Sequence, residues 1–553
     1  MRAHQRMWKG LRWRLSATRR LWSRGMTPSM ELLPSSPTIL TEPLAHIDPL
    51  PEKLRRTSVT IKGWVLLPEA ATDRVEIFLD GVPLGRARLG VARVDVARHV
   101  VHPLAPISGF ELLADLSEWS GADGAATLTV EATSVDGERH QIEPLPVAIS
   151  SEAPKGSDLR PPAPVPMDLP GPRPRVLVFT HQLGLGGAQL YLLDLLRELV
   201  RTEAGTFVVV SAMDGPVRED LEALGVPVHL SSPIPFDDLG SHLSRIEELA
   251  GWAEGRDFDA VLINTATTLS SPGAEVAERL GLPVVWAIHE SFPPSFLFGD
   301  LIPEVRKEID RALQRSSFLV FEAEATKRLF EPAAGSARCV MLPYGLDLEP
   351  IEAARESFDR AAARRKHGIP EDAQAIVCIG TVEPRKAQTL LAQAFDRIAT
   401  RHPRAHLYFV GGRDDDNSNA LRSYIASSPN SERAELVPIT PEVEPWYGMA
   451  DFLVSASDVE SLPRTVLEAM AWETPVLATD VFGLPELITD GETGWLCEAR
   501  DLEALAAGLD HALGTSEEER AAIARAARSL VEERHSLERY GREIAGLFDK
   551  ALN

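Results

Sequence analysis

Cysteine is scarce in this 553-residue sequence. Only Cys339, Cys378 and Cys497 occur, and their spacing matches neither a metal-ligand motif nor a disulfide framework. So few cysteines are typical of the reducing cytoplasm, which is the location that we predict.

Long apolar runs are also absent. No stretch approaches the roughly 20 apolar residues that a membrane-spanning helix needs, although 44% of the residues are hydrophobic and 25% are charged, as in ordinary globular proteins. The first 25 residues do not resemble a secretory signal, because basic residues interrupt every apolar segment. We therefore expect neither a transmembrane span nor a cleaved leader.

Positive charge is sparse outside the N-terminus. The formal net charge is −24, yet residues 1–25 contain eight Lys or Arg and no acid, so the remainder carries −32 by difference. A body this acidic repels nucleic acid, which we exclude as a partner.

The N-terminal residues 7–26 have a helical apolar pattern. Trp8, Leu11, Leu15 and Trp22 share one face, while most of the basic residues lie on the other. A basic amphipathic helix lies in the plane of an anionic membrane, so peripheral contact with the inner face of the plasma membrane is predicted. Two alternatives stay open: a disordered tail, or a translation start at Met26 or Met30.

Composition shifts predict several domains, as the length requires. Short alternating strands dominate the early part of the chain, a Pro-rich tract follows, and two series of buried strands alternate with helices after it. These features predict a basic segment (1–30), a small all-β sandwich (45–150), a Pro-rich linker (151–173), two α/β domains (174–355 and 356–525) and a C-terminal helix (526–553).

The predicted sandwich contains two hairpin signals, Asp80-Gly81 and Asp136-Gly137. Its aromatic residues could form a core or a sugar platform; both interpretations stay open for Trp64, Phe78, Phe110 and Trp119.

The α/β part consists of continuous Val/Ile/Leu strands such as "RVLVFT", "AVLINTA", "PVVWAIHE", "AIVCIGTV" and "DFLVSAS". Such strands alternating with helices predict parallel sheets covered on both faces. Ligands bind at the carboxyl ends of the strands in such sheets, which directs attention to the loops there.

The loop after the first strand, "HQLGLGGAQ", contains Gly186 and Gly187, which would let the backbone approach a ligand at a helix N-terminus. A plain tight turn is the alternative. The dinucleotide motif G-x-G-x-x-G is missing from this loop, and G-x-x-x-x-G-K-[ST] is missing from the whole sequence, which disfavours NAD and P-loop chemistry.

Two further loops carry charged residues. His289 and Glu290 end a buried strand, where a lone histidine is more often structural. Arg385 and Lys386 fall at a predicted helix start, where cations are unfavourable unless an anion offsets them. A phosphate group would be such an anion, and a solvated basic turn is the alternative.

The stretch "ESLPRTVLEAM" places Glu460 before a helix that Pro463 is expected to begin. Glu468 follows within the helix, among apolar residues; a solvated surface position is the alternative. One ligand would explain these features: a sugar near Glu460, a diphosphate beside Arg385 and Lys386, and a ribose near Glu468.

Taken together, these segments resemble the retaining glycosyltransferases of family 4, which have the GT-B fold of two facing Rossmann-like domains. The resemblance covers roughly residues 174–550 and includes five segments in order. These are "GLGGAQ", "VVWAIHE", "VMLPYGLDL", "GTVEPRKAQTLL" and the E-x7-E region "ESLPRTVLE", and the terminal "HSLERYGREIAGLF" is similar to the family's last helix, which packs back on the first domain.

The resemblance implies a role for each matched residue. Glu460 would hold the donor sugar, Glu468 the ribose, and Lys386 with Arg385 the diphosphate. His289 would lie near the transferred sugar, and the remaining donor-side positions are Gly186, Gly187, Gly380, Thr381, Ser461, Leu462, Pro463 and Arg464. Thr381 stands where the family has Arg, Tyr344 where it has Asn, and Ser461-Leu462-Pro463 where it has Gly-Phe-Gly.

The predicted function is transfer of a sugar from a nucleotide-diphosphate sugar to a hydroxyl of a glycan or lipid-linked acceptor, with retained configuration and without cofactor or metal. Cell-surface polysaccharide or glycolipid synthesis is the expected setting. The alternative is a non-catalytic nucleotide-sugar-binding scaffold on the same fold. A phosphorylase or an epimerase is a further rival, and no pyridoxal-type lysine is evident for the former.

Overall fold

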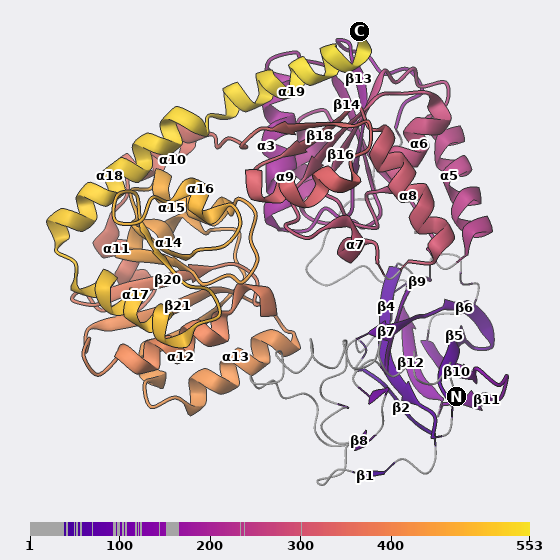
Figure 1. Cartoon of the computed structure of the whole chain (residues 1–553), viewed down its shortest axis with the longest axis horizontal. Coiled ribbons are helices and arrows are strands. Elements are labelled where there is room, and N and C mark those ends of the chain that lie inside the picture. Colours follow the sequence, from indigo (N-terminus) through magenta and orange to yellow (C-terminus); the bar gives the residue numbers. More distant parts are fainter. Residues whose placement is uncertain are drawn as a thin grey trace. The chain divides into compact units, whose positions relative to one another are not determined.

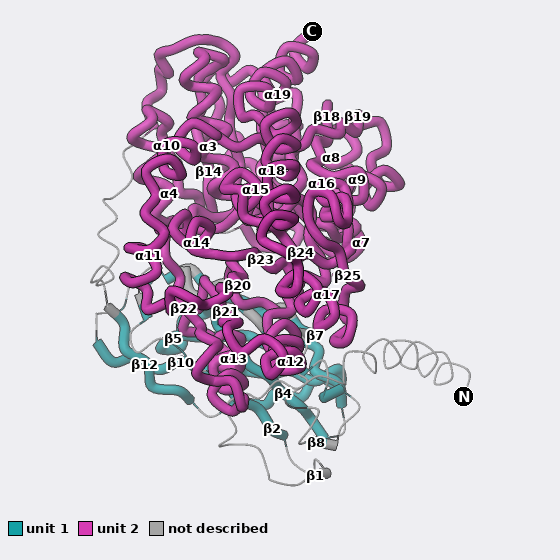
Figure 2. The backbone as a smooth tube through the Cα atoms, turned by 90° about the vertical axis from the view of Figure 1, so that its left-hand side faces the viewer, with its two compact units in different colours: residues 1–151 teal, residues 152–553 magenta. Residues whose placement is uncertain are grey.

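The computed structural model describes residues 38–39, residues 43–150 with short gaps, and residues 165–553 except 233, 237 and 300. The chain divides into two compact units, residues 1–151 and 152–553, which Figure 2 colours separately. The predicted basic segment and most of the Pro-rich stretch lie outside the described residues. Within the described part, no helix combines the length and apolarity needed to cross a bilayer.

The first unit is built from strands. They are β1 (Thr38–Ile39), β2 (Leu44–Ile47), β3 (Leu54–Arg55), β4 (Ser58–Leu66), β5 (Thr72–Leu79), β6 (Val82–Arg86), β7 (Arg88–Val91), β8 (Val100–Val101), β9 (Gly109–Asp115), β10 (Gly124–Ser134), β11 (Arg139–Gln141) and β12 (Leu145–Ser150). One sheet has the order β3-β12-β10-β5-β6 with β11 beside β10, another has β2-β4-β9-β7, and β1 pairs with β8. Apolar residues of β4 and β9 share one core with those of β5 and β10.

Both predicted hairpin turns are present in this unit. Asp80 and Gly81 join β5 to β6 with φ of 48° and 79°, and Gly137, with φ of 85°, lies in the turn between β10 and β11. Positive φ at these positions explains the need for Asp-Gly. Trp64, Phe110 and Trp119 are buried, so these three rings serve packing and cannot form a sugar platform.

The second unit begins with a seven-stranded parallel sheet of order β15-β14-β13-β16-β17-β18-β19. Its strands are β13 (Arg175–Thr180), β14 (Thr206–Ser211), β15 (Val228–Leu230), β16 (Ala260–Asn264), β17 (Val284–Ile288), β18 (Phe318–Phe321) and β19 (Arg338–Met341). Its helices are α3 (Gly187–Arg201), α4 (Val217–Ala223), α5 (Leu239–Ala253), α6 (Pro272–Leu280), α7 (Pro294–Leu297), α8 (Pro303–Arg315) and α9 (Glu324–Phe330).

A second parallel sheet of order β22-β21-β20-β23-β24-β25 follows in the same unit. Its strands are β20 (Gln374–Ile379), β21 (Ala405–Gly412), β22 (Ala434–Pro438), β23 (Phe452–Ser455), β24 (Val476–Thr479) and β25 (Trp495–Cys497). Its helices are α10 (Leu348–Glu356), α11 (Arg360–Lys366), α12 (Gln388–Ile398), α13 (Asp416–Ser427), α14 (Glu444–Met449), α15 (Arg464–Ala471), α16 (Leu484–Leu487) and α17 (Leu502–Gly514).

Both sheets are covered on two faces, as the continuous apolar strands predicted. Helices α3 and α4 cover one face of the first sheet, and α5, α6 and α8 cover the other. In the second sheet α14 and α15 lie opposite α12, α13 and α17. The predicted architecture of two Rossmann-like domains after an all-β region is confirmed.

The C-terminus forms two helices where one was expected over 526–553. Helix α18 (Glu517–Arg534) packs on the second domain, and α19 (Leu537–Leu552) begins after a break at His535. Figure 1 shows α19 lying beside α3 of the first domain. At the break, the N–H of Leu346 donates to the carbonyl of His535 at 2.8 Å and ties the interdomain segment to it.

Candidate active site

The strand order reverses at the same place in both sheets, between β13 and β16 in the first and between β20 and β23 in the second. Ligands of doubly wound sheets bind at this switch point, beyond the carboxyl ends of the strands. The sequence-predicted residues on the first domain follow β13 and β17, and those on the second follow β20 and β23. They therefore lie at the edges where this fold binds its ligands.

His181 directly follows β13 and is neutral. Its Nε2 faces two amide donors, Gln182 Nε2 at 3.2 Å and Gln189 Nε2 at 3.1 Å, while its Nδ1 lies 3.2 Å from Thr265 Oγ1. A ring nitrogen that faces only donors must accept. Burial, aided by the charge of His289, lowers the pKa of His181 to about 4.

His289 directly follows β17, and both of its ring nitrogens face side-chain oxygens. Its Nδ1 hydrogen-bonds the carboxylate of Glu322, and its Nε2 lies 2.9 Å from Asn264 Oδ1. The amide of Asn264 is oriented by its own donation to the Ala188 carbonyl at 3.0 Å, so both ring nitrogens face acceptors. Burial alone would lower the pKa of His289, but Glu322 and Glu290 together outweigh it and raise that pKa.

Three tyrosines pack behind His289. The ring of Tyr191 on α3 meets the imidazole edge-on at 4.3 Å between centroids, and its hydroxyl hydrogen-bonds Tyr540 of α19. Tyr344 packs edge-on against Tyr191 at 5.6 Å. The buried hydroxyl of Tyr344 has no hydrogen-bond partner among the described residues, although this tyrosine stands where the resembling family has Asn.

The second domain gathers Glu460, Lys386 and Arg385 at its edge. Lys386 Nζ donates to Glu460 Oε2 at 3.1 Å, and Arg385 Nη1 lies 3.3 Å from the same oxygen. Ser457 Oγ donates to it at 3.2 Å. Burial alone would raise the pKa of Glu460, but the two cations lower it, so the carboxylate is ionised.

The sequence predicted that Arg385 and Lys386 begin an α-helix, and the structure differs. They lie in a 3-10 turn, Pro384–Lys386, which Ala387 in the left-handed region (φ 51°) separates from α12. Both cations lie just before the N-terminus of α12 and contact the Glu460 carboxylate, which offsets the unfavourable position of positive charge near a helix start.

Gly380 and Thr381 lie under this turn. Gly380 has φ of 140°, and a Cβ there would contact the Lys386 side chain at 3.4 Å, so a larger residue would strain the backbone beside the cation. Thr381 Oγ1 donates to Glu383 Oε1 at 2.8 Å, and Glu383 also accepts from Arg385 Nε at 2.8 Å. Two carboxylates and two cations thus balance at this edge.

Helix α15 begins at Arg464, one residue later than predicted. Pro463 caps it in an extended conformation (ψ 120°), and its carbonyl accepts from Val466 N–H at 3.0 Å. Ser461 and Leu462 are buried. The Ser461 hydroxyl lies 3.0 Å from that of Thr326, which belongs to α9 of the first domain.

Glu468 is bound by two protein donors. Tyr447 donates its hydroxyl to Oε2, and Arg464 Nε donates to Oε1, each at 2.6 Å. Arg464 Nη1 reaches Asp194 Oδ2 of α3 at 2.5 Å. Glu468 is thus a partly buried group in a charged network between the two domains, and the solvated surface alternative is wrong.

The structure brings some of the predicted residues together in two groups and leaves the others apart. Glu460, Lys386, Arg385, Thr381 and Gly380 form one; Glu468 and Arg464 form another; His289 stands apart from both, and Gly186 and Gly187 lie at the start of α3. Sequence reasoning missed Asn264 and Glu322, which end β16 and follow β18. Polar residues at those strand ends were the available signal.

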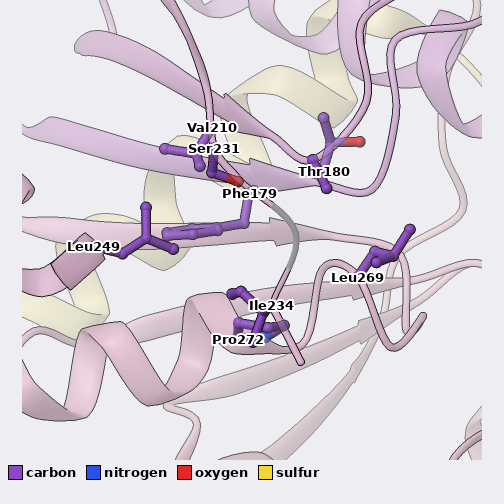
Figure 3. Close-up of a pocket in the computed structure, with 9 residues that line it drawn as sticks. Phe179, Thr180, Val210, Ser231, Ile234, Leu249, Leu269 and Pro272 are labelled. Carbon is purple, nitrogen blue, oxygen red and sulfur yellow. The ribbon is translucent and has the colours of Figure 1, made fainter. Parts of the chain in front are cut away.

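A small cavity of about 10 Å³, room for about one water molecule, lies elsewhere in the first domain. Figure 3 shows its lining by Phe179, Leu249, Leu269 and neighbouring residues. None of the sequence-predicted site residues lines it. It is too small to hold a ligand larger than a water molecule.

Known families match both halves of the second unit. The pattern of "Glycosyltransferase Family 4" matches residues 185–350, and that of "Glycosyl transferases group 1" matches residues 359–530. The D-inositol 3-phosphate glycosyltransferase of Geodermatophilus obscurus is 28% identical over 360 residues, which is 60% of this chain and 78% of the relative. A GDP-mannose-dependent alpha-(1-6)-phosphatidylinositol monomannoside mannosyltransferase of Mycolicibacterium smegmatis is 27% identical over 58% of this chain and 84% of its own.

Solved structures share the fold. The Anabaena protein Alr3699/HepE, crystallised with UDP and glucose, has a TM-score of 0.59 at 19% identity and matches 68% of this chain and 100% of its own. WaaG, a glycosyltransferase of lipopolysaccharide biosynthesis, has a TM-score of 0.52 at 16% identity, over 68% of this chain and 99% of its own. With two family patterns matched in order on a GT-B architecture, the chain belongs to glycosyltransferase family 4.

Proposed function

We propose that the protein is a retaining glycosyltransferase that moves a sugar from a nucleotide-diphosphate sugar to an acceptor hydroxyl. The observation that carries this proposal is the group at the second domain's edge, where Lys386 and Arg385 converge on Glu460. An ionised carboxylate beside two cations can hold sugar hydroxyls while the cations turn to a diphosphate. The resemblance to family 4 assigns those roles to the same residues.

The reaction forms a bond between the acceptor oxygen and the anomeric carbon, and it breaks the bond from that carbon to the diphosphate. The bonding electron pair leaves with the diphosphate, and the acceptor proton goes to the departing phosphate oxygen on the same face. Fixed cations aimed at the developing charge stabilise such a transition state. We therefore propose that turnover requires neither a metal ion nor a cofactor.

The nature of the acceptor is inferred from the relatives' names. One acts on D-inositol 3-phosphate, another on a phosphatidylinositol monomannoside, and WaaG takes part in lipopolysaccharide biosynthesis. A polyol, glycan or lipid-linked hydroxyl is the shared chemistry. We propose a role in the synthesis of a cell-surface polysaccharide or glycolipid.

The deciding experiment measures release of nucleoside diphosphate by the purified full chain from a panel of UDP-, GDP-, ADP- and dTDP-sugars. We expect one donor class to be turned over, product NMR to show the anomeric configuration retained, and Glu460→Gln to abolish transfer. Binding of a nucleotide sugar without turnover, across acceptors that include inositol phosphates and glycolipids, would favour the non-catalytic scaffold.

We further propose that the N-terminal residues 7–26, which lie outside the described residues, bring the enzyme to the inner face of the plasma membrane. Each cation near an anionic surface contributes about 1 kcal/mol. The full chain should sediment with anionic vesicles at low salt and be released as salt rises, while a chain starting at Met26 should stay in solution. Equal sedimentation of the two chains would end this proposal.

A further inference from the structure

A continuous ion network joins the two Rossmann-like domains. Asp194 on α3 accepts from Arg464 Nη1 at 2.5 Å through Oδ2 and from Arg197 Nη1 at 2.7 Å through Oδ1. Arg464, the first residue of α15, reaches Glu468 one turn later through its Nε, and Tyr447 bonds the other oxygen of Glu468. One guanidinium therefore binds a carboxylate of each domain.

The members of this network lie mostly away from water. Side chains of Asp194, Arg464 and Glu468 are 12%, 19% and 14% exposed. At such depth the removal of one partner leaves an unpaired charge, which costs far more than the loss of a surface ion pair. Arg197 is 43% exposed, so its bond to Asp194 contributes much less.

The network leaves Glu468 able to bind a further ligand. An ionised carboxylate has about four acceptor positions, and Arg464 and Tyr447 occupy one on each oxygen. The two remaining positions suit a pair of neighbouring hydroxyl groups, such as the 2′- and 3′-hydroxyls of a ribose. Arg464 and Tyr447 together fix which way these positions point.

We propose that Arg464 and Asp194 are positioning residues that orient Glu468 for the donor ribose only while the two domains are in contact. This inference rests on the proposed function, in which Glu468 holds the ribose. Asp194 belongs to the opposite domain and acts only through Arg464. Separation of the domains breaks the bond to Asp194 and frees Arg464 to swing, so donor affinity is coupled to domain contact.

The test measures, by calorimetry on the full chain, the affinity for the nucleoside diphosphate of the preferred donor and for its 2′,3′-dideoxy analogue. Asp194→Asn should weaken the ribose form about five- to tenfold, the loss expected when a hydrogen bond to a charged group is disturbed. The dideoxy form should lose less than about twofold, because it cannot use Glu468.

Three further variants separate this role from general damage. In a Glu468→Gln background, the addition of Asp194→Asn should not weaken the affinity any further, because the effect of Asp194 passes through Glu468. Arg464→Lys should weaken the ribose form at least as much as Asp194→Asn, since an ammonium ion lacks the fork that binds two carboxylates. Arg197→Gln is the matched control and should leave both affinities unchanged.

Two results would overturn different statements. If wild type binds the ribose and dideoxy forms equally, the proposed ribose role of Glu468 is wrong, and this inference fails with it. If wild type discriminates but Asp194→Asn weakens both forms equally, Glu468 still binds ribose and only the coupling through Arg464 is wrong. The ratio of the ribose-form affinity to the dideoxy-form affinity is measured within one folded variant, so a general loss of stability cannot imitate the expected pattern.

Discussion

The carboxyl edges of the two Rossmann-like sheets use charge differently. At the first edge two partly buried histidines have pKa values shifted in opposite directions: the pKa of His181, which faces amide donors, is lowered, and that of His289, which lies between Glu322 and Asn264, is raised. At the second edge Lys386 and Arg385 meet one carboxylate, Glu460. The two sheets thus share one topology but differ in their charged groups. In the first domain neighbouring groups set the protonation of the histidines, and in the second domain a carboxylate lies against two basic side chains.

The comparison shows what each edge can contribute to transfer. The second edge places two basic side chains together, and Glu460 and Glu383 outweigh burial and raise the pKa of Arg385, which suits a diphosphate whose charge grows in the transition state. The pKa of His289 is lowered by burial and raised by Glu322 and Glu290, so its protonation responds to its neighbours. We therefore expect substitutions at the second edge to change rate at all pH values and those at the first to change the pH dependence.

The largest effect is expected for Lys386→Ala. Removal of one group that stabilises the leaving charge costs on the order of 2 kcal/mol in the barrier, so turnover should fall by at least about tenfold, in the presence or absence of EDTA. Lys366→Ala is a suitable control, because Lys366 is 70% exposed. Full loss of wild-type activity on chelation would show that a metal supplies the charge instead.

The next effect is expected for Glu322→Gln. Burial lowers the pKa of His289 and Glu322 raises it. The uncharged amide of the Glu322→Gln variant removes this raising effect, so His289 should lose its proton at a lower pH than in wild type. Turnover at pH 8 should fall about three- to tenfold, on the order of 1 kcal/mol, with a smaller loss toward acid pH. Glu324→Gln, at a neighbouring half-buried position that makes no contact with His289, should keep the wild-type profile. Superimposable pH profiles for Glu322→Gln and wild type would show that the imidazolium plays no part in the rate.

The fold was predictable wherever the apolar pattern was strong. Every strand quoted for the α/β region is present, because strands buried on both faces consist almost entirely of Val, Ile and Leu. The sequence did not reveal β15, β19 and β25. Each has three or four residues and lies at a sheet edge, where one side needs no apolar cover.

The sequence indicated which loops carry the site residues, but it indicated less well which side chains those residues contact. Glu460, Lys386 and Arg385 were expected to act near one another, and they do lie together. The bond from Arg464 to Asp194 spans 270 positions in the chain, so no local pattern could indicate it. The 3-10 turn at Pro384 was also missed, because a left-handed Ala387 has no signal in composition.

A smaller effect concerns stability and the two histidines. The folded-state pKa of His181 is about 4, below its ordinary value of 6.5, so the unfolded chain binds more protons in that interval and stability falls as pH drops through it. His289 has a raised pKa, so its contribution is complete below pH 6.5 and is lost at higher pH. Denaturant unfolding of wild type and His181→Asn should differ by about 1 kcal/mol more at pH 7.5 than at pH 5.5. A constant difference would mean that His181 is not held neutral.

The smallest effect concerns the hydroxyl of Tyr344, which lies in the segment that joins the two Rossmann-like domains. Removal of the Tyr191 hydroxyl is the matched comparison. Both changes to Phe remove one buried hydroxyl, but the hydroxyl of Tyr191 bonds Tyr540, whereas that of Tyr344 has no hydrogen-bond partner among the described residues. A satisfied hydroxyl stabilises by about 1 kcal/mol, and an unsatisfied buried one costs free energy. Tyr191→Phe should therefore lower the unfolding temperature, and Tyr344→Phe should leave it unchanged or raise it slightly. Equal losses in the two variants would mean that the Tyr344 hydroxyl has a hydrogen-bond partner in solution.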